Sequence, residues 1–466
     1  MAFRLWLALG STSRTDSDQA IVGLMALQLL RHGHMNAFFW KQSYGGGLEA
    51  FAVAPSLAVF GTNTLGLVFP SVVFGLIAAW LSWRIARRFF SPLIAAASGI
   101  LSLFWPAASV WFGTRERGFY PLTAMLGLLM VLTAVRINDE PKRTWRWVIL
   151  GASVGVGWWM SPNIVYYAVP MSVWLLVRGH WRQWLNILAS VVSAFAGSTV
   201  WWYANLHSHF ASLQQPPWAG STTYLDRFKF FWSHAFPFAL GLRRPWLASW
   251  VLSAAWANLL YIGILVTIAV ATAISLKHRA AWAGSPDLVL LVASPFIFAA
   301  FVGNWHLYEG RYEYFLASIL PLVMCRAMTL RAGRALLAVI ATVGMWSFVR
   351  LDIPRFTKAR LPSTVPIGRA LQAAGYRTAI GDHWVAYQLT FESDERVIAT
   401  RLPSPRYDAY ANQVRASRPA LVYRIVRNHE QPQLHLMAFL RAHHIGFRTL
   451  TAGGYFAVLP ESQVLP

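Results

Sequence analysis

Cysteine and acidic residues are scarce in this chain. Cys325 is the only cysteine among 466 residues, which excludes a disulfide framework. Asp and Glu together number 18, against 40 Lys and Arg. Common signatures of soluble enzymes are also missing, because the sequence has no Walker loop, no GxSxG elbow, no HExxH and no CxxC. The three glycines at 45–47 lack the Lys and the Ser or Thr of a phosphate-binding loop, so they predict a turn that leads into a helix.

Apolar residues dominate the composition instead. Hydrophobic residues make up 56% of the chain, with 24 Trp, 29 Phe and a mean hydropathy of +0.43. Crossing a bilayer takes about 17–25 apolar residues, and stretches of this kind recur along the sequence. The composition therefore predicts a polytopic membrane protein that is mainly α-helical, with about ten or eleven spans in a bundle. The ten segments predicted to span are 65–83, 93–111, 120–137, 147–160, 163–178, 184–203, 250–275, 287–303, 314–330 and 334–350.

The amino terminus fits this pattern poorly. MAFRLWLALGS has about ten apolar residues, too few to span a bilayer alone. We expect either a truncated or misassigned start or a partial span. A cleaved signal peptide fits less well, because a distinct basic region and a small-residue cleavage site are missing.

Basic residues predict the orientation of the spans, since Lys and Arg accumulate at cytoplasmic ends. They cluster in alternate loops, which assigns the other loops to the extracytoplasmic side: residues 12–62, 112–119, 204–249, 304–313 and everything after 350. The net charge of +22 is partly this topology signal. Membrane lipids are therefore expected partners and nucleic acid is not, because no basic stripe lies on a recognisable soluble binding module.

The composition changes after Arg350. Segments with helical and strand periods alternate through residues 351–466, which predicts a small extracytoplasmic α/β domain behind a transmembrane domain at 1–350. The predicted helices are 367–375, 383–392, 406–417 and 433–444, and the predicted strands are 377–382, 396–400, 420–425 and 454–460. Asp382, His383 and Trp384 form a polar and aromatic cluster there, and we interpret His383 as a surface or junction residue.

Asp18 and Glu49 are carboxylates beside apolar segments in the first extracytoplasmic loop. Ionisable groups near membrane depth are costly and often mark substrate paths or chemistry. Each acid also has a structural explanation, because an acid in the first turn of a helix is stabilised by the helix dipole. Asp16 is better placed than Asp18 to cap the helix at 20–30, although the two could exchange roles.

Several further polar side chains are predicted on the same side of the membrane. Arginine suits a lipid phosphate because its forked donors match the phosphate oxygens. Arg311 has the alternative role of a membrane-edge anchor. The candidates for substrate binding are Arg115, Arg117, His306, Arg311 and Tyr312.

The layout of these motifs resembles a known group. YGGGLEAFAVAPSLAVFG precedes the first full span, GWWMSPNIVYYAVP lies midway and EGRYEYFLASILP comes late. Residues 10–350 resemble polyprenol-dependent glycosyltransferases of the GT-C superfamily. More narrowly, they are similar to the bacterial members of the family that contains protein O-mannosyltransferases, aminoarabinose transferases and Rgt-type sugar transferases.

This resemblance implies roles for individual residues. It implies that Asp18 is the catalytic acid, with DQA standing where many relatives have DEA, and that Glu49 is the second loop acid. Arg311 and Tyr312 correspond to a pair placed near the carrier phosphate in relatives. Tyr44 belongs to the YGGGLEAF motif and is a further substrate-binding candidate. Gln19 replaces the usual acid, which puts in doubt any metal site that relatives build there.

The implied reaction transfers a sugar from a polyprenyl-phosphate donor to a lipid, glycan or protein acceptor at the outer face of the bacterial inner membrane. Asp18 would act as general base with inversion at the anomeric carbon, and no cofactor is predicted, although a divalent cation stays open. The alternative is a non-catalytic binder or transporter of lipid-linked saccharides. A third interpretation makes residues 351–466 the functional part, but ten spans exceed what anchoring needs.

Overall fold

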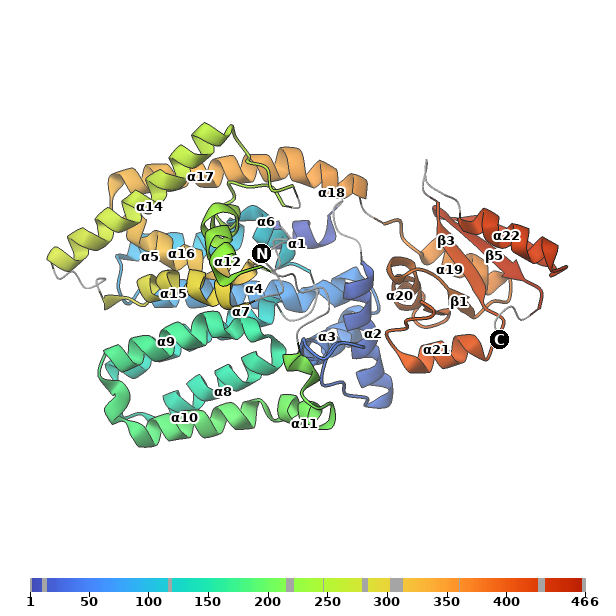
Figure 1. The fold of residues 1–466 in the computed structure, drawn as a ribbon, viewed down its shortest axis with the longest axis horizontal. Helices are drawn as coiled ribbons and strands as arrows, with labels where there is room; N and C mark the ends of the chain where they lie inside the picture. The colour runs from blue at the N-terminus through green and yellow to red at the C-terminus, as the bar shows by residue number, and fades with distance from the viewer. Residues whose placement is uncertain are drawn as a thin grey trace. The chain divides into compact units, whose positions relative to one another are not determined.

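The computed structural model describes residues 2–10, 15–115, 120–214, 222–245, 247–278, 284–301, 313–359, 361–425 and 432–462. Within these ranges the chain forms two compact units. The helical unit contains the described residues within 1–10, 71–115 and 119–358, and the mixed unit contains those within 11–70 and 359–466. Figure 1 shows helices through the first unit and a small sheet in the second.

The helical unit consists of α-helices and the loops that connect them. Figure 1 shows α8, α9 and α10 running alongside one another in it. Single turns of 3-10 helix lie at Pro162–Ile164, His180–Arg182 and Ala211–Leu213, and π-helical turns at Phe231–Ala235 and Phe348–Asp352. The α-helices are α1 (Ala2–Leu9), α4 (Thr64–Ala86, from Ser71 on in this unit), α5 (Pro92–Phe104), α6 (Ala107–Phe112), α7 (Tyr120–Asp139), α8 (Thr144–Met160), α9 (Val165–Val177), α10 (Trp184–Gly197), α11 (Thr199–His207), α12 (Tyr224–Phe230), α13 (Phe236–Ala239), α14 (Ala254–Lys277), α15 (Asp287–Ala300), α16 (Tyr314–Met328), α17 (Arg331–Ser347) and α18 (Ile353–Ala359).

Helix occupies each of the ten segments predicted to span. Among the described residues, four helices are long and apolar enough to cross a membrane, or five if the bent pair α10 and α11 forms one span. The remaining segments hold shorter helices, and two of them are interrupted. Pro106 separates α5 from α6 because proline lacks the N–H that a continuing helix needs. The segment 184–203 bends by 55° between α10 and α11.

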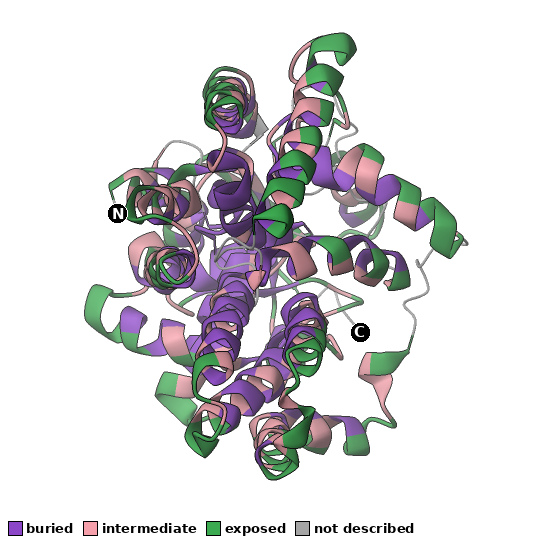
Figure 2. Cartoon of the chain, turned by 90° about the vertical axis from the view of Figure 1, so that its left-hand side faces the viewer, coloured by how far each residue is buried: buried purple, intermediate pink, exposed green. Residues whose placement is uncertain are grey.

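Large apolar side chains cover the outer faces of these helices. Figure 2 shows buried residues gathered toward the inside and exposed residues along outward helix faces. Contiguous exposed apolar surface is unusual in a soluble monomer, so this pattern supports a multi-pass membrane protein. The exposed residues include Leu185, Leu188, Val192 and Phe195 of α10, and Leu259, Ile262, Val266 and Val270 of α14.

A fully buried ion pair joins α15 to α16. Arg326 Nε lies 2.8 Å from Asp287 Oδ2, and Arg326 Nη2 lies 3.0 Å from Asp287 Oδ1. Ser285 accepts a further hydrogen bond from Nη2 at 3.0 Å. The guanidinium therefore makes the forked, two-point contact that suits arginine and carboxylate.

The mixed unit contains a five-stranded sheet within its described residues. The strands are β1 (Thr378–Ile380), β2 (Ile398–Thr400), β3 (Ala420–Arg424), β4 (Phe447–Ala452) and β5 (Tyr455–Pro460), in the order β2-β1-β3-β5-β4. β1 runs parallel to β2 and β3, whereas β5 is antiparallel to β3 and β4. Its helices are α2 (Ser17–His32), α3 (Leu48–Phe60), α19 (Val365–Ala373), α20 (His383–Glu392), α21 (Asp408–Arg415) and α22 (Pro432–Ala442).

The predicted fold class is confirmed: a mainly helical membrane protein carries a small α/β domain at its carboxy terminus. The two amino-terminal helices of the mixed unit share one core with that domain. Ile21 and Leu24 of α2 and Val53 of α3 are buried in the same cluster as Tyr387 and Phe391 of α20. The predicted first loop is thus folded together with the carboxy-terminal residues.

Candidate active site

Asp16 and Asp18 have different roles at the start of α2. Asp16 is the N-cap, and its carboxylate accepts a hydrogen bond from Gln19 N at 3.0 Å. The Gln19 side chain accepts in return from Asp16 N at 3.3 Å, which completes a capping box. The prediction that Asp16 caps this helix is confirmed. Gln19 is used for capping, and the Asp18 carboxylate is not the cap.

Asp18 lies against a histidine 365 residues further along the chain. Asp18 Oδ1 is 3.4 Å from His383 Nε2, with 20% of the Asp18 side chain and 17% of the His383 side chain exposed. Ser17 Oγ also donates to the backbone carbonyl of His383. Our interpretation of His383 as a surface or junction residue misses this contact.

The start of α20 holds His383 in place. Asp382 is the N-cap and accepts from Trp384 N at 2.7 Å and Val385 N at 3.0 Å. The His383 ring packs edge-on against the rings of Trp384 and Tyr387. An N-cap and two aromatic contacts therefore position the imidazole that meets Asp18.

Polar contacts fasten the other end of α2 to the carboxy-terminal residues. Arg31 forms ion pairs with Asp394 at 2.6 Å and with Glu395, and Gln28 Nε2 donates to Glu395 Oε1 at 2.8 Å. Tyr410 donates to the same carboxylate. Burial, and then the nearby Glu395 charge, raises the pKa of the Tyr410 phenol, so it stays protonated and able to donate.

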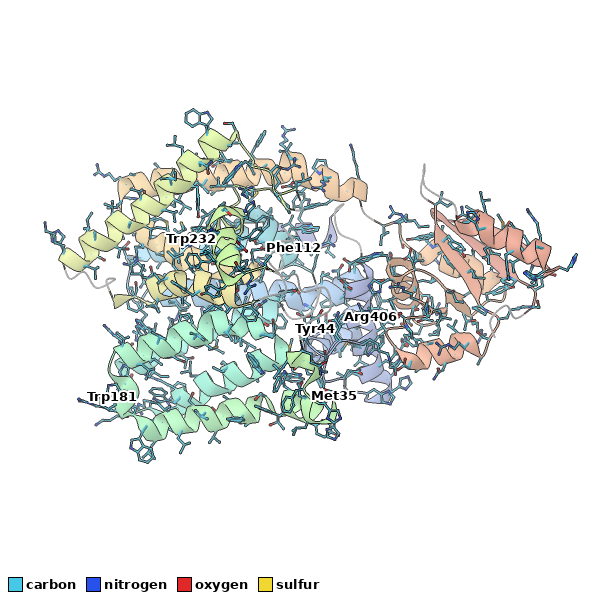
Figure 3. The ribbon with its side chains drawn as sticks, in the orientation of Figure 1. Met35, Tyr44, Phe112, Trp181, Trp232 and Arg406 are labelled. Carbon is cyan, nitrogen blue, oxygen red and sulfur yellow. The ribbon has the colours of Figure 1, made fainter. Side chains whose placement is uncertain are left out.

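Glu49 lies in the first turn of α3 and is 2% exposed. The glycines before it form a turn into the helix, as predicted. Gly45 has φ +76°, a conformation that favours glycine, and a β-carbon at Gly47 would overlap the carbonyl oxygen of Asn36. Tyr44, in the loop between α2 and α3 (Figure 3), is 43% exposed and can be reached from outside the unit.

The remaining predicted site residues belong to the helical unit or lie outside the described residues. Arg115 belongs to the helical unit, where it is buried and its guanidinium lies 4.0 Å from the centre of the Trp111 ring. Arg117, His306, Arg311 and Tyr312 lie outside the described residues. The site that the structure does bring together is therefore Asp18 with His383, on a unit that also carries Glu49 and Tyr44.

Comparison with known proteins finds one matching family and a shared fold. Residues 48–203 match the family described as dolichyl-phosphate-mannose-protein mannosyltransferase. The fold is similar to that of ArnT from Cupriavidus metallidurans in the apo state, with a TM-score of 0.67 and 12% identity over 99% of this chain and 97% of ArnT. Over nearly its whole length the chain has the fold of ArnT. A second structure of ArnT from the same organism, bound to undecaprenyl phosphate, matches with a TM-score of 0.66 and 12% identity over the same shares of both chains. Among curated proteins, none matches this sequence.

The family match covers some of the candidate site residues and not others. It starts at residue 48, so it includes Glu49, Arg115 and Arg117, whereas Asp18 precedes it and Arg311 follows it. His383 lies far outside the match, and no local pattern ties it to Asp18. The only sequence signal was its place in a polar cluster at the start of a predicted helix.

Proposed function

We propose that this protein is a membrane glycosyltransferase of the GT-C type, which transfers a sugar from a polyprenyl-phosphate donor to a lipid, glycan or protein acceptor. The transfer takes place at the outer face of a bacterial inner membrane, on the side that also carries the carboxy-terminal domain. ArnT, whose fold this chain shares, has been crystallised with undecaprenyl phosphate. That complex supports a carrier of the same chemical kind here.

The observation that carries the proposal is that the Asp18 carboxylate lies outside the helix cap and is partly exposed. Asp16 and Gln19 close the capping box without it, so its carboxylate has no part in capping the helix. One fifth of its side chain is exposed, so an acceptor hydroxyl or amine can reach it. A carboxylate that is accessible and held by a neighbour is the arrangement that a general base requires.

The reaction then follows from the chemistry of the donor. Asp18 takes the proton of the acceptor hydroxyl or amine while the acceptor atom attacks the anomeric carbon. The bond from that carbon to the phosphate oxygen breaks, and its electron pair leaves with the polyprenyl phosphate. A single displacement inverts the anomeric carbon. His383 holds the Asp18 carboxylate toward the acceptor through its ring N–H.

Arginine side chains offset the charge on the departing phosphate. In our proposal Arg311 and Tyr312 serve the carrier phosphate, with help from Arg115, Arg117 and His306, and Glu49 orients the acceptor or holds the loop. Cationic donors of this kind stabilise a phosphate dianion directly. We therefore propose that no metal ion is needed.

Replacing His383 with glutamine is expected to lower kcat about five- to tenfold and to leave donor affinity unchanged. One hydrogen bond to the base is lost, and such a bond contributes about 1 kcal/mol. The matched control is His435→Gln on the exposed side of α22, which should keep the wild-type kcat. A His383→Gln enzyme with unchanged kcat would show that the contact with Asp18 has no role in turnover.

Transfer by the purified protein tests the function. Radiolabelled sugars on synthetic polyprenyl phosphates are offered with lipid, glycan and peptide acceptors, with and without EDTA. We expect labelled product and free polyprenyl phosphate in equal amounts, at a rate that EDTA does not change. Donor binding without transfer across the panel would instead favour a binder or transporter of lipid-linked saccharides. A rate that EDTA abolishes and a divalent cation restores would contradict the metal-free mechanism.

A further inference from the structure

Arg4 is a buried cation whose donors are only partly satisfied. It lies in α1 and is 3% exposed, although it belongs to an apolar amino-terminal segment. Its Nη2 donates to the carbonyl oxygen of Ser102 at 2.7 Å. Nε and Nη1 have no hydrogen-bond partner among the described residues, and within the same ranges no carboxylate pairs with the guanidinium.

Such a group is costly to keep. A buried charge without a counter-charge loses several kcal/mol of solvation, and the loss is larger beside a membrane, where ionisable residues usually serve a function. The guanidinium of an arginine is effectively always charged in proteins. The unpartnered nitrogens Nε and Nη1 carry three N–H donors between them, which suit an acceptor with negative charge.

A small cavity adjoins this guanidinium. Its volume is about 20 Å³, which is room for one oxygen atom of a ligand or for one water. Its polar lining comes from Arg4, Ser102, Trp105, Tyr314 and Ser318, and no carboxylate is among its described lining residues. The indole N–H of Trp105 is buried and, like the two groups of Arg4, lacks a partner in the described part of the chain.

We propose that Arg4 and Trp105 bind one oxygen atom of a phosphate group at this cavity in the helical unit. The lining presents hydrogen-bond donors and one full positive charge, which excludes a cation as the ligand. Guanidinium donors match phosphate oxygens in spacing, and in this environment the phosphate comes from a lipid headgroup or from the surrounding solution. This site uses none of the residues assigned above to the reaction.

Gly75 of α4 leaves the space that the Arg4 guanidinium occupies. A β-carbon at Gly75 would overlap Nη1 of Arg4. Because the overlap involves the far end of a flexible side chain, Gly75→Ala should move the guanidinium and leave the helices in place. This substitution changes the geometry of the site without changing its charge.

Lipid binding by the full-length protein tests the site. Native mass spectrometry is used to titrate wild type, Arg4→Gln, Gly75→Ala and the exposed control Arg334→Gln with a polyprenyl monophosphate and with the uncharged polyprenol. Arg4→Gln and Gly75→Ala should bind the monophosphate about tenfold to hundredfold more weakly than wild type, because charge-assisted hydrogen bonds to the phosphate are lost. Arg334→Gln should bind like wild type, and the polyprenol should bind all four proteins equally.

Further ligands identify the source of the phosphate. If the affinity for phosphatidylglycerol depends on Arg4 in the same way, the site binds bilayer lipids. If the affinity for inorganic phosphate depends on Arg4, the site binds a free ion. Dependence with the polyprenyl monophosphate alone would assign it to the carrier. Equal affinities of wild type, Arg4→Gln and Gly75→Ala for every phosphate ligand would overturn the proposal and leave the cavity to water. If Arg4→Gln does not fold, Gly75→Ala alone decides.

This test is separate from the test of transfer. Binding is measured without a sugar donor or an acceptor, so a protein that fails to transfer sugar can still show the phosphate dependence. A protein that transfers sugar can equally well bind phosphate without using Arg4. The proposed function and the proposed phosphate contact are therefore tested by different measurements.

Discussion

Replacing Asp18 with asparagine is expected to lower kcat for sugar transfer about 10²- to 10⁴-fold, the range that general-base catalysis contributes. Asparagine has nearly the same shape and keeps an oxygen that can accept from His383. It cannot take up the proton of the acceptor. Donor affinity should stay close to that of wild type, because the proposed phosphate contacts are made elsewhere. Initial rates and donor binding, measured on the same preparation, check both expectations.

Asp16→Asn is the matched control. It makes the same chemical change two residues away, and asparagine caps helices as well as aspartate does, so the capping box with Gln19 should survive. We expect kcat within about twofold of wild type. If Asp18→Asn keeps most of its activity, or if both variants lose it equally, Asp18 is not the base and the mechanism must be assigned to another acid.

Asp287→Ala should be the most destabilising single substitution among the predictions for this chain. Arg326 and Asp287 are almost completely buried and meet at two points. Removing the carboxylate leaves the arginine charge uncompensated inside the helical unit, which costs about 3–5 kcal/mol. Unfolding in mixed micelles, followed by circular dichroism, should show a transition at clearly lower denaturant.

Two comparisons make this result specific to the buried charge. The double variant Asp287→Leu with Arg326→Met removes both charges, and it should recover most of the lost stability because an apolar pair of similar volume replaces the ion pair. Glu140→Ala breaks exposed ion pairs with Arg143 and Arg146 and should leave the transition almost unchanged. A double variant as unstable as Asp287→Ala would point to lost packing rather than to an uncompensated charge.

The secondary structure of the carboxy-terminal domain could be predicted from the sequence because each segment has a clear period. The helix predicted at 383–392 is α20, and the strand predicted at 420–425 contains β3. β4 was not predicted. Its residues alternate weakly and are largely exposed, so they lack the apolar face that marks a half-buried strand. Its pairing with β5 depends on the turn at Gly453 and Gly454, both with positive φ.

The membrane helices show a different limit of the sequence. The apolar segments of the sequence predicted the positions of the helices, but they did not predict where the helices are interrupted. The interruption at Pro106 has a local cause that the sequence carries. The bend between α10 and α11 falls at Gly197 and Ser198, a glycine–serine pair of the kind at which helices kink, and the apolar run through it hid that signal.

For the candidate site, the sequence predicted single residues and not their arrangement. Asp16 could be assigned as a cap because capping depends on residues three apart. The contact of Asp18 with His383 joins positions 365 apart, and local patterns carry no information about it. Arg4 did carry a signal, a lone charge within an apolar run, which the shortness of that run obscured.

The joint folding of α2 with the carboxy-terminal residues limits how this protein can be recombined with its relatives. An exchange at residue 350 would pair the α2 of one parent with the α20 of another, and Ile21 and Leu24 would meet foreign partners in place of Tyr387 and Phe391. The ion pairs of Arg31 with Asp394 and Glu395 would be lost at the same junction. The smallest segment that can be inherited or grafted as a working piece is therefore discontinuous: it takes residues 11–70 together with 359–466.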